Sequence, residues 1–350
     1  MDALLRYSLY QIAYGLLGLE IFLMLACCLA IIVTKLLTRW TRNRNARIEE
    51  GLSKLIEAYL FNSLPTETIQ IPKGMRNFRN LVETLENYDH LFNDQRWIEI
   101  KERIVKTDLL PRTESYASSI FWSKRQLAAR ALLLCPKLAN ENLLEKLLDD
   151  PRYLVRVVAA VCITQISNQK LFYKVILKMS QETSLSQFPY RDALIQADQA
   201  KYAWVESLAS SEKDKAVVAI CLDILSTRYS GNLLPLIKSF VNDPDPQCRT
   251  FAIKALGNIP NNESIDLLIH RLVDSDWKIR AEAITSLQKL YALKSIDNLR
   301  FMLSDPVWWV RLQAALTLKA FGKEGLEVLT SQEKSEPRAY EIARYALAIP

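Results

Sequence analysis

The most constraining feature of this chain is a short motif that recurs at a fixed spacing. The dipeptide Asp-Pro places prolines at 151, 244 and 306, whose numbers differ by 93 and 62, or three and two times 31. An arginine stands five residues after each proline, at Arg156, Arg249 and Arg311. A fixed period of this length is typical of stacked structural repeats, in which each repeat contacts only its neighbours. We therefore expect a solenoid, a class of fold that mostly binds other molecules.

The repeats are expected to be helical. The chain has only 8 glycines in 350 residues and few alternating apolar runs, which favours an all-α fold. We call the positions that recur every 31 residues the grid. An alanine stands three residues after each arginine on this grid, and a small residue there allows paired helices to approach closely. Aspartate suits a helix start, and a buried arginine requires a partner, so we interpret these pairs as structural. The pairs are Asp150 with Arg156, Asp243 with Arg249, Asp274 with Arg280, and Asp305 with Arg311.

The pattern Asp-Pro-x-x-x-x-Arg-x-x-Ala-x-x-Ala-Leu, as in Asp243 to Leu256, resembles the HEAT repeat. The 31-residue spacing is similar to the short bacterial HEAT-like class that also occurs in phycobilin lyases. Over residues 112–350 this resemblance implies a right-handed α-solenoid of helical hairpins, with Asp and Arg forming a hydrogen-bonded ladder between repeats. It does not fix a function. A lyase or other small-molecule-binding enzyme and a nucleic-acid-binding protein remain alternatives to a protein-binding scaffold.

The grid is disturbed between residues 182 and 220. Its arginine positions there fall on Gln187 and Val218, and the stretch 182–189 has the composition of a loop. We expect a distorted repeat or an insertion at this place. Pro337 returns to the grid near the end of the chain, which predicts a truncated terminal repeat that caps the stack.

The N-terminal region contains a candidate transmembrane helix at residues 12–37. Residues 12–33 carry one charged group, Glu20, and as a helix would extend for about 33 Å, enough to cross a bilayer core. Basic residues follow it with no acid before Glu49, so the positive-inside rule places residues 1–11 outside and the solenoid in the cytoplasm. The repeat type suggests a bacterial inner membrane. The basic residues, which could also contact anionic lipid headgroups, are Lys35, Arg39, Arg42, Arg44 and Arg47.

Two other interpretations of this segment are weaker. A cleaved signal peptide has a shorter apolar region that is preceded by positive charge, and a lipoprotein cut before Cys27 would leave an apolar stretch after the lipid. Within the helix, small residues and one acid could contact a partner helix, although Glu20 could also lie near an interface. These candidate contacts are Gly15, Gly18, Glu20, Ala26 and Ala30.

Residues 38–111 form a basic juxtamembrane segment followed by helices outside the grid. Apolar residues at helical spacing predict helices near 47–61, from about Phe78, and from about Trp97, with a cap at Asn93-Asp94. The stretch 64–74 contains Pro65, Pro72 and Gly74 and is expected to be a loop.

Aromatic residues recur three positions before the grid arginines. Four of the five such positions are aromatic, and equivalent positions of a solenoid form a row along one edge. Such rings either pack over the preceding turn as core or form a protein-binding edge. Trp309 should point about 100° away from Trp308, so the two are not expected to be equally buried. The candidate partner-binding residues are Trp122, Tyr153, Trp277, Trp308 and Trp309.

The sequence offers no catalytic constellation. It lacks phosphate-binding glycine loops and a nucleophile elbow, has only 2 histidines, and its 6 cysteines lack metal-ligand spacing. Four of the cysteines lie in helical patterns and are expected to be core residues in a reducing compartment. We therefore expect no enzyme activity, cofactor, metal or nucleic acid. The sequence favours a membrane-anchored scaffold for a protein partner, such as a membrane enzyme of envelope or polysaccharide synthesis, and does not indicate an oligomeric state.

Overall fold

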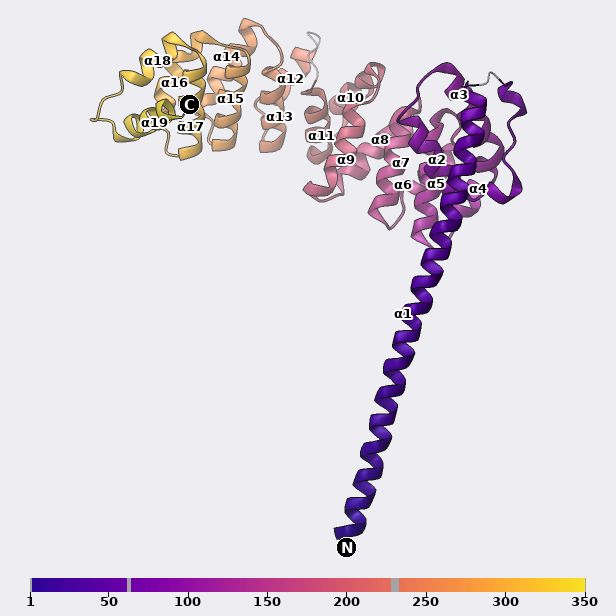
Figure 1. The fold of residues 1–350 in the computed structure, drawn as a ribbon. Helices are drawn as coiled ribbons and strands as arrows, with labels where there is room; N and C mark the ends of the chain where they lie inside the picture. Colours follow the sequence, from indigo (N-terminus) through magenta and orange to yellow (C-terminus); the bar gives the residue numbers. More distant parts are fainter. Residues whose placement is uncertain (1, 62–63, 228–232, 350) are drawn as a thin grey trace. The chain divides into compact units, whose positions relative to one another are not determined.

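The computed structural model describes residues 2–61, 64–227 and 233–349, with side chains from residue 22 onward (Figure 1). Within these ranges it is helical and contains no strand. The chain divides into two compact units, Met1–Ala139 and Asn140–Pro350. The sequence pattern predicts that the repeats start at residue 112. The boundary between the two units falls later, after the hairpin of α4 (Leu110–Ala117) and α5 (Trp122–Leu134).

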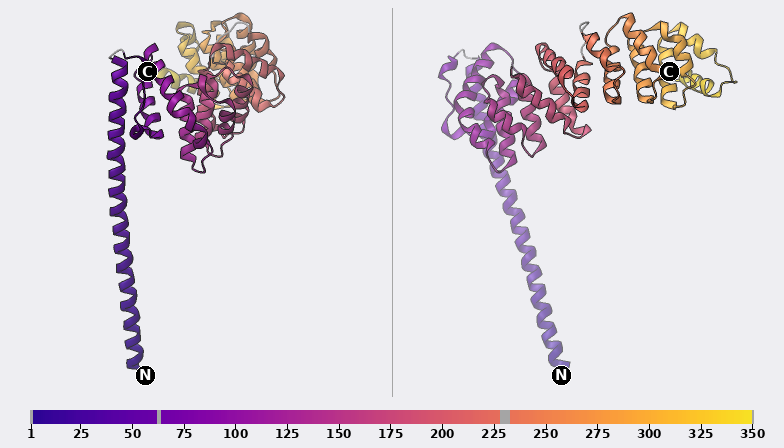
Figure 2. Two further views of the ribbon diagram at one scale, coloured as in Figure 1. Left: turned by 90° about the vertical axis from the view of Figure 1, so that its right-hand side faces the viewer. Right: turned by 180° about the vertical axis from the view of Figure 1, so that it is seen from behind.

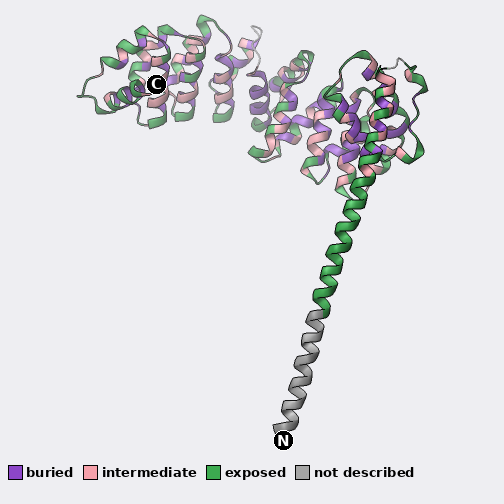
Figure 3. Cartoon of the chain, viewed as in Figure 1, coloured by how far each residue is buried: buried purple, intermediate pink, exposed green. Residues whose placement is uncertain are grey.

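The first unit begins with one long helix, α1 (Asp2–Phe61), which is continuous in every view (Figure 2). The segments that the sequence treated separately, 12–37 and 47–61, are therefore parts of a single helix. Its apolar side chains from Phe22 to Trp40 are exposed, and burial begins only at Ile48 (Figure 3). Only the last turns of α1 contribute to the core of the unit.

The core of the first unit surrounds the end of α1. The helices α2 (Phe78–Asp89) and α3 (Gln95–Ile104) follow, and a π-helical turn (Val105–Leu109) leads into α4. Asp94 caps α3 by accepting a hydrogen bond of 2.8 Å from the Trp97 amide, which confirms the predicted cap. The largest fully buried side chains include Leu52 and Ile56 of α1 together with Phe78 and Trp97.

The second unit is a stack of helical hairpins in two layers (Figures 1 and 2). The layer that carries the grid arginines, called the arginine layer below, consists of α7 (Tyr153–Gln165), α9 (Ser184–Ile195), α11 (Lys215–Leu225), α13 (Pro246–Leu256), α15 (Trp277–Lys289), α17 (Trp308–Ala320) and α19 (Pro337–Ala348). The opposite layer consists of α6 (Glu141–Leu148), α8 (Gln169–Ser180), α10 (Gln199–Ser211), α12 (Leu234–Phe240), α14 (Asn262–His270), α16 (Ile296–Met302) and α18 (Lys323–Thr330). This arrangement is an α-solenoid.

The grid alanines explain why adjacent helices of the arginine layer pack closely. Ala252, Ala283 and Ala314 are completely buried, and α13, α15 and α17 pack against one another in sequence. Alanine has no side-chain carbon beyond Cβ, so the backbones of adjacent helices can approach without strain. The leucines and isoleucines around each alanine fill the space between the layers.

The structure corrects two details of the predicted repeat. The grid aspartates do not cap the helices directly. Asp274 lies three residues before the first residue of α15 and accepts the amide hydrogen of Asp276, which is itself the N-cap of α15. In addition, the stretch 182–189 is not a loop, because α9 begins at Ser184 and runs through Pro189. Proline lacks the amide that would bond to the fourth preceding carbonyl, which made this segment resemble a loop in the sequence.

Candidate functional site

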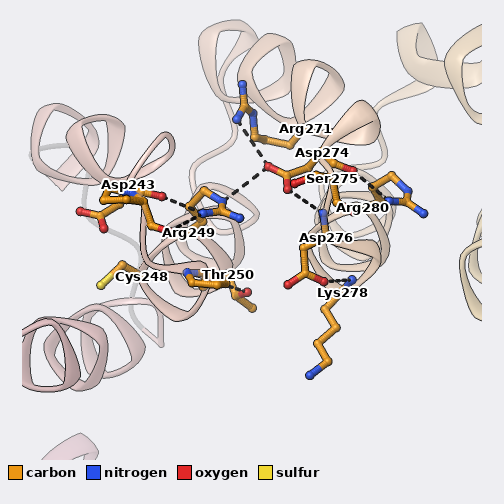
Figure 4. A network of polar contacts seen from close by, with 12 residues as sticks. Asp243, Cys248, Arg249, Thr250, Arg271, Asp274, Ser275, Asp276, Lys278 and Arg280 are labelled. Carbon is orange, nitrogen blue, oxygen red and sulfur yellow. Dashed lines mark hydrogen bonds and ion pairs between the residues drawn. The ribbon is translucent and has the colours of Figure 1, made fainter.

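The grid arginines link each repeat to the next (Figure 4). Arg280 is buried and binds both carboxylate oxygens of Asp305, at 2.7 and 2.9 Å, in the following repeat. Its other terminal nitrogen donates to the carbonyl of Asp274, at 2.8 Å, in its own repeat. A planar guanidinium can satisfy both directions at once, which a lysine cannot. Arg280 thus joins the turn before its own helix to the turn before the next helix of the layer.

The same geometry recurs at other repeats. Arg156 donates to the Asp150 carbonyl at 2.9 Å and forms an ion pair of 2.5 Å with Glu182. Arg249 donates to the Asp243 carbonyl at 2.9 Å and lies 3.5 Å from Asp274. Arg311 donates to the Asp305 carbonyl at 2.7 Å.

The irregular repeat replaces these contacts with others. Gln187 occupies an arginine position and donates to the carbonyl of Glu182 at 3.2 Å. Glu212 occupies an aspartate position and accepts the amide of Asp214 at 3.0 Å, as the grid aspartates do. Lys215 forms an ion pair of 2.6 Å with Asp243 in the next repeat, so the link survives although Val218 stands at the arginine position. The stack is therefore continuous where the sequence motif is lost.

The aromatic positions of the grid are mostly exposed. The exposed fractions are 41% for Trp122, 38% for Trp277 and 42% for Trp308 at these positions, and 60% for the adjacent Trp309, so none of the four tryptophans is a core residue. Tyr153 is half-buried and donates a hydrogen bond of 3.1 Å to the Ser186 carbonyl, which gives it a structural contact. Trp122 lies in the first unit and the other four residues lie in the second.

Trp308 and Trp309 form the centre of an exposed aromatic cluster. Their ring centroids are 4.9 Å apart at 77°, and Trp308 also meets Tyr345 of α19 edge-on at 6.3 Å. Tyr345 is itself exposed. The sequence analysis missed Tyr345 because it lies outside the aromatic position of the grid, and only the packing of α19 beside α17 brings it near Trp308.

A cavity of about 560 Å³ opens on the arginine layer, at α9, α11, α13 and α15. We call it the Phe188 pocket. Its walls include two phenylalanines and several charged groups, none of which the sequence analysis had singled out. The principal lining residues are Phe188, Arg191, Ile220, Asp223, Phe251, Lys254 and Lys278.

The charged groups of the Phe188 pocket are organised around Asp223. This carboxylate is buried and pairs with Arg191, and its Oδ1 accepts a hydrogen bond of 3.0 Å from Lys254. Burial alone would raise the pKa of Asp223, but the hydrogen bonds from Arg191 and Lys254 outweigh it and lower the pKa below its ordinary value. Asp223 is therefore ionised at neutral pH, and its charge is shared between two cations.

The buried cysteines take no part in a reactive site. Cys135, Cys162, Cys221 and Cys248 are all buried, as expected for core residues. Burial raises the pKa of Cys221 to about 12, which suppresses the thiolate that would react. Among the described residues, no group of three or more histidine, cysteine or acidic side chains could hold a metal ion.

The exposed part of α1 carries the candidate membrane contacts. Described residues from Phe22 include one apolar stretch with a mean hydropathy of 2.0, long enough to cross a membrane and unburied by the rest of the chain. Ala26, Ala30 and the five basic residues from Lys35 to Arg47 are exposed on this helix. Arg44 lies over the Trp40 ring, 5.6 Å from its centroid. Gly15, Gly18 and Glu20 lie outside the residues whose side chains the structure describes.

Comparison with known proteins agrees with this architecture. Residues 202–288 and 265–348 match the sequence model for HEAT repeats. Residues 202–348 of the second unit are therefore HEAT repeats. No curated protein sequence matches this chain.

Several solved structures are similar to this chain. Escherichia coli YibA is 15% identical, with 74% of this chain and 98% of YibA covered and a TM-score of 0.40. Kap121p bound to Pho4p is 14% identical, with 84% and 39% covered and a TM-score of 0.44. Human deoxyhypusine hydroxylase in complex with glycerol is 16% identical, with 71% and 96% covered and a TM-score of 0.29. These similarities concern the fold alone.

Proposed function

We propose that this protein is a membrane-anchored scaffold that holds a protein partner against its HEAT repeats and has no chemistry of its own. The observation that carries the proposal is the exposed cluster of Trp308, Trp309 and Tyr345. Tryptophan and tyrosine contribute more binding energy than other residues at protein interfaces, and a folded chain seldom exposes three such rings together without a use.

The exposed N-terminal helix supports the membrane anchor. Its apolar residues from Phe22 to Leu37 would face water if the protein were free in solution, whereas a bilayer covers all sides of such a helix. The basic residues that follow favour a cytoplasmic position for the repeats, with the N-terminus outside, and suit contact with anionic headgroups. A bacterial inner membrane, as the repeat type suggests, is the setting we propose.

A partner that resides at the same membrane fits this arrangement. Confining both proteins to one surface raises the effective concentration of each for the other, so even a modest interface would be occupied. An enzyme of envelope or polysaccharide synthesis is the class that we propose to test first. Small residues on the transmembrane helix, including Ala26 and Ala30, would allow such a partner to make a second contact within the bilayer.

Affinity purification of the full-length protein tests this function. The tagged chain would be expressed in its own cells, solubilised in mild detergent, and compared with the double variant Trp308→Ala/Trp309→Ala. Because losing two central aromatic residues costs about 2 kcal/mol or more at a typical interface, we expect at least tenfold lower recovery of the partner. Equal recovery with both proteins would contradict the proposal.

A matched control removes exposed apolar surface elsewhere in the same unit. Phe301 of α16 and Val273, which follows α14, are strongly exposed, so Phe301→Ala/Val273→Ala should leave partner recovery unchanged. Protease treatment of sealed inner-membrane vesicles of known orientation tests the topology separately. The repeats should be digested only when the cytoplasmic face is accessible, and digestion from the opposite face would overturn the orientation.

A further inference from the structure

The Phe188 pocket exists because one repeat carries smaller residues than its neighbour. On α13, positions 247, 250 and 251 are Gln, Thr and Phe, and all three line the pocket. The equivalent positions one repeat earlier, on α11, are Ala216, Ala219 and Ile220, which also line it. The shorter side chains of α11 leave a hollow between α9 and α13. The cavity is therefore a local modification of a regular surface.

The pocket combines an apolar wall with an excess of positive charge. Phe188 is 57% exposed, and Ile220 is buried beneath the opening. Three cations line the cavity, Arg191, Lys254 and Lys278, against the single carboxylate of Asp223. That carboxylate already accepts hydrogen bonds from Arg191 and Lys254. Lys278 has no ion-pair partner among the described residues, so positive charge remains available to a ligand.

One more acidic group lies near these cations. Glu282 of α15 interacts electrostatically with Lys254 and with Lys289, and burial raises its pKa. Counted as fully ionised, Glu282 and Asp223 are two acids against the three cations of the cavity. Glu282 does not line the cavity. The charge balance at the opening therefore stays positive even when this neighbour is included.

We propose that the Phe188 pocket binds an acidic side chain and an adjacent apolar side chain of an extended segment of the partner protein. This inference rests on the proposed scaffold function and specifies the chemistry of its partner. An acidic group would pair with Lys278 and the exposed side of Lys254, while an apolar group would lie against Phe188 and Phe251. The unlike charges would attract the partner segment, and the apolar wall beside them would fix which of its residues enters the pocket.

The grid connects this pocket with the tryptophan cluster. Ala216, Gln247, Lys278 and Trp309 are successive residues at intervals of 31, so they occupy equivalent positions on α11, α13, α15 and α17. Adjacent packed helices lie about 8–10 Å apart, which places Trp309 about 8–10 Å from Lys278 and about 24–30 Å from the α11 wall of the pocket along one face. An extended chain rises about 3.3 Å per residue, so a segment of about seven to nine residues would reach from one to the other.

Fluorescence anisotropy with synthetic peptides tests the pocket without requiring the native partner. Full-length protein in detergent would be titrated against a labelled twelve-residue peptide of alternating acidic and large apolar residues. Two comparison peptides replace the acids by lysine or the apolar residues by serine. We expect the acidic, apolar peptide to bind at least tenfold more tightly than either, and its affinity to fall with added salt.

Variants of exposed residues locate the site. Lys278→Glu reverses the unpaired charge, and Ala216→Trp fills the cavity without removing a contact, so each should weaken peptide binding at least tenfold. Lys170→Glu and Phe301→Ala change exposed residues of the opposite layer and should leave it unchanged. Circular dichroism of each variant establishes that the helices remain folded.

Three results would overturn the inference. They are equal binding of the lysine peptide, unchanged affinity in both pocket variants, or stronger competition by a DNA oligonucleotide than by the unlabelled acidic peptide. If the peptide fails to bind while the native partner is still captured and is lost with Trp308→Ala/Trp309→Ala, the pocket assignment is wrong and the scaffold function stands. If the peptide binds as expected but the double variant captures all partners normally, the proposed tryptophan interface is wrong instead.

Discussion

Residues 243–320 and residues 182–227 belong to the same stack of helices, but different residue types link the repeats in the two regions. In the first region each turn is fixed by an aspartate and an arginine on the grid, as in the Arg280 and Asp305 pair. In the second, Glu212, Gln187 and Lys215 provide similar contacts from other residue types. The regular region specifies its geometry through one repeated motif, whereas the irregular region keeps the stack while changing its surface.

This difference teaches where a binding site can arise in a repeat protein. Substitutions at the polar links alter little of the helix packing, because buried alanines and branched apolar residues still hold the layers together. The exposed positions are then free to vary. Small residues on α11 open the Phe188 pocket in the irregular region, while the large Trp309 occupies the equivalent position in the regular region.

The largest effect is expected from removing a grid arginine of the regular region. Arg280→Ala leaves the buried carboxylate of Asp305 without its charged partner, and breaking a buried pair in this way costs about 3 kcal/mol. Urea unfolding should show a lower midpoint. Arg311→Ala is the control, because Arg311 bonds to backbone carbonyls of its own turn and should cost less. Equal losses in both variants would contradict the importance of the link between repeats.

A smaller effect is expected at Asp223 in the pocket. Asp223→Asn removes the charge that pairs with Arg191 and Lys254, and we expect a loss of about 1–2 kcal/mol at pH 7. Because the folded-state pKa of Asp223 is lowered, its contribution is fully present above the unfolded pKa of about 3.9 and is lost as pH falls through the folded pKa. Stability curves of the two proteins should therefore converge below about pH 4. A constant difference down to pH 2 would exclude this cause.

The smallest effect is expected at the replacement link of the irregular repeat. Lys215 is nearly half exposed, so Lys215→Ala should lower the free energy of unfolding by at most about 1 kcal/mol. Added salt should weaken the pair in the unmodified protein and reduce the difference further. A loss as large as that of Arg280→Ala would show that the two regions do not differ in how they hold the stack.

The repeat architecture could be predicted from the sequence because it depends on spacing. Proline, arginine and alanine at one fixed interval identify the helices of the arginine layer, and the cap at Asp94 follows from local rules. The stretch 182–189 was wrongly predicted to be a loop, whereas α9 runs through Pro189. Packing of this helix on its neighbours outweighs the local helix-breaking effect of the proline. The Phe188 pocket could not be predicted at all, since it depends on the absence of side-chain volume at Ala216 and Ala219 relative to α13.

The candidate site was only partly visible in the sequence. Equivalent grid positions identified Trp308 and Trp309, but not whether they would be buried, because an aromatic residue near a helix start suits either environment. Tyr345 completes the cluster through tertiary packing alone. A comparison of positions 216, 247, 278 and 309 would have revealed the shared face, because the same period that locates the scaffold also aligns its exposed residues.

Site-specific photo-crosslinking in living cells tests most directly whether the arginine layer presents the binding face. A photoreactive phenylalanine analogue would replace Trp309, Phe188 or, as the control on the opposite layer, the 72% exposed Phe301. We predict that positions 309 and 188 form a crosslinked adduct with the same partner protein and that position 301 does not. An adduct of equal yield at position 301, with none at positions 309 and 188, would contradict this account.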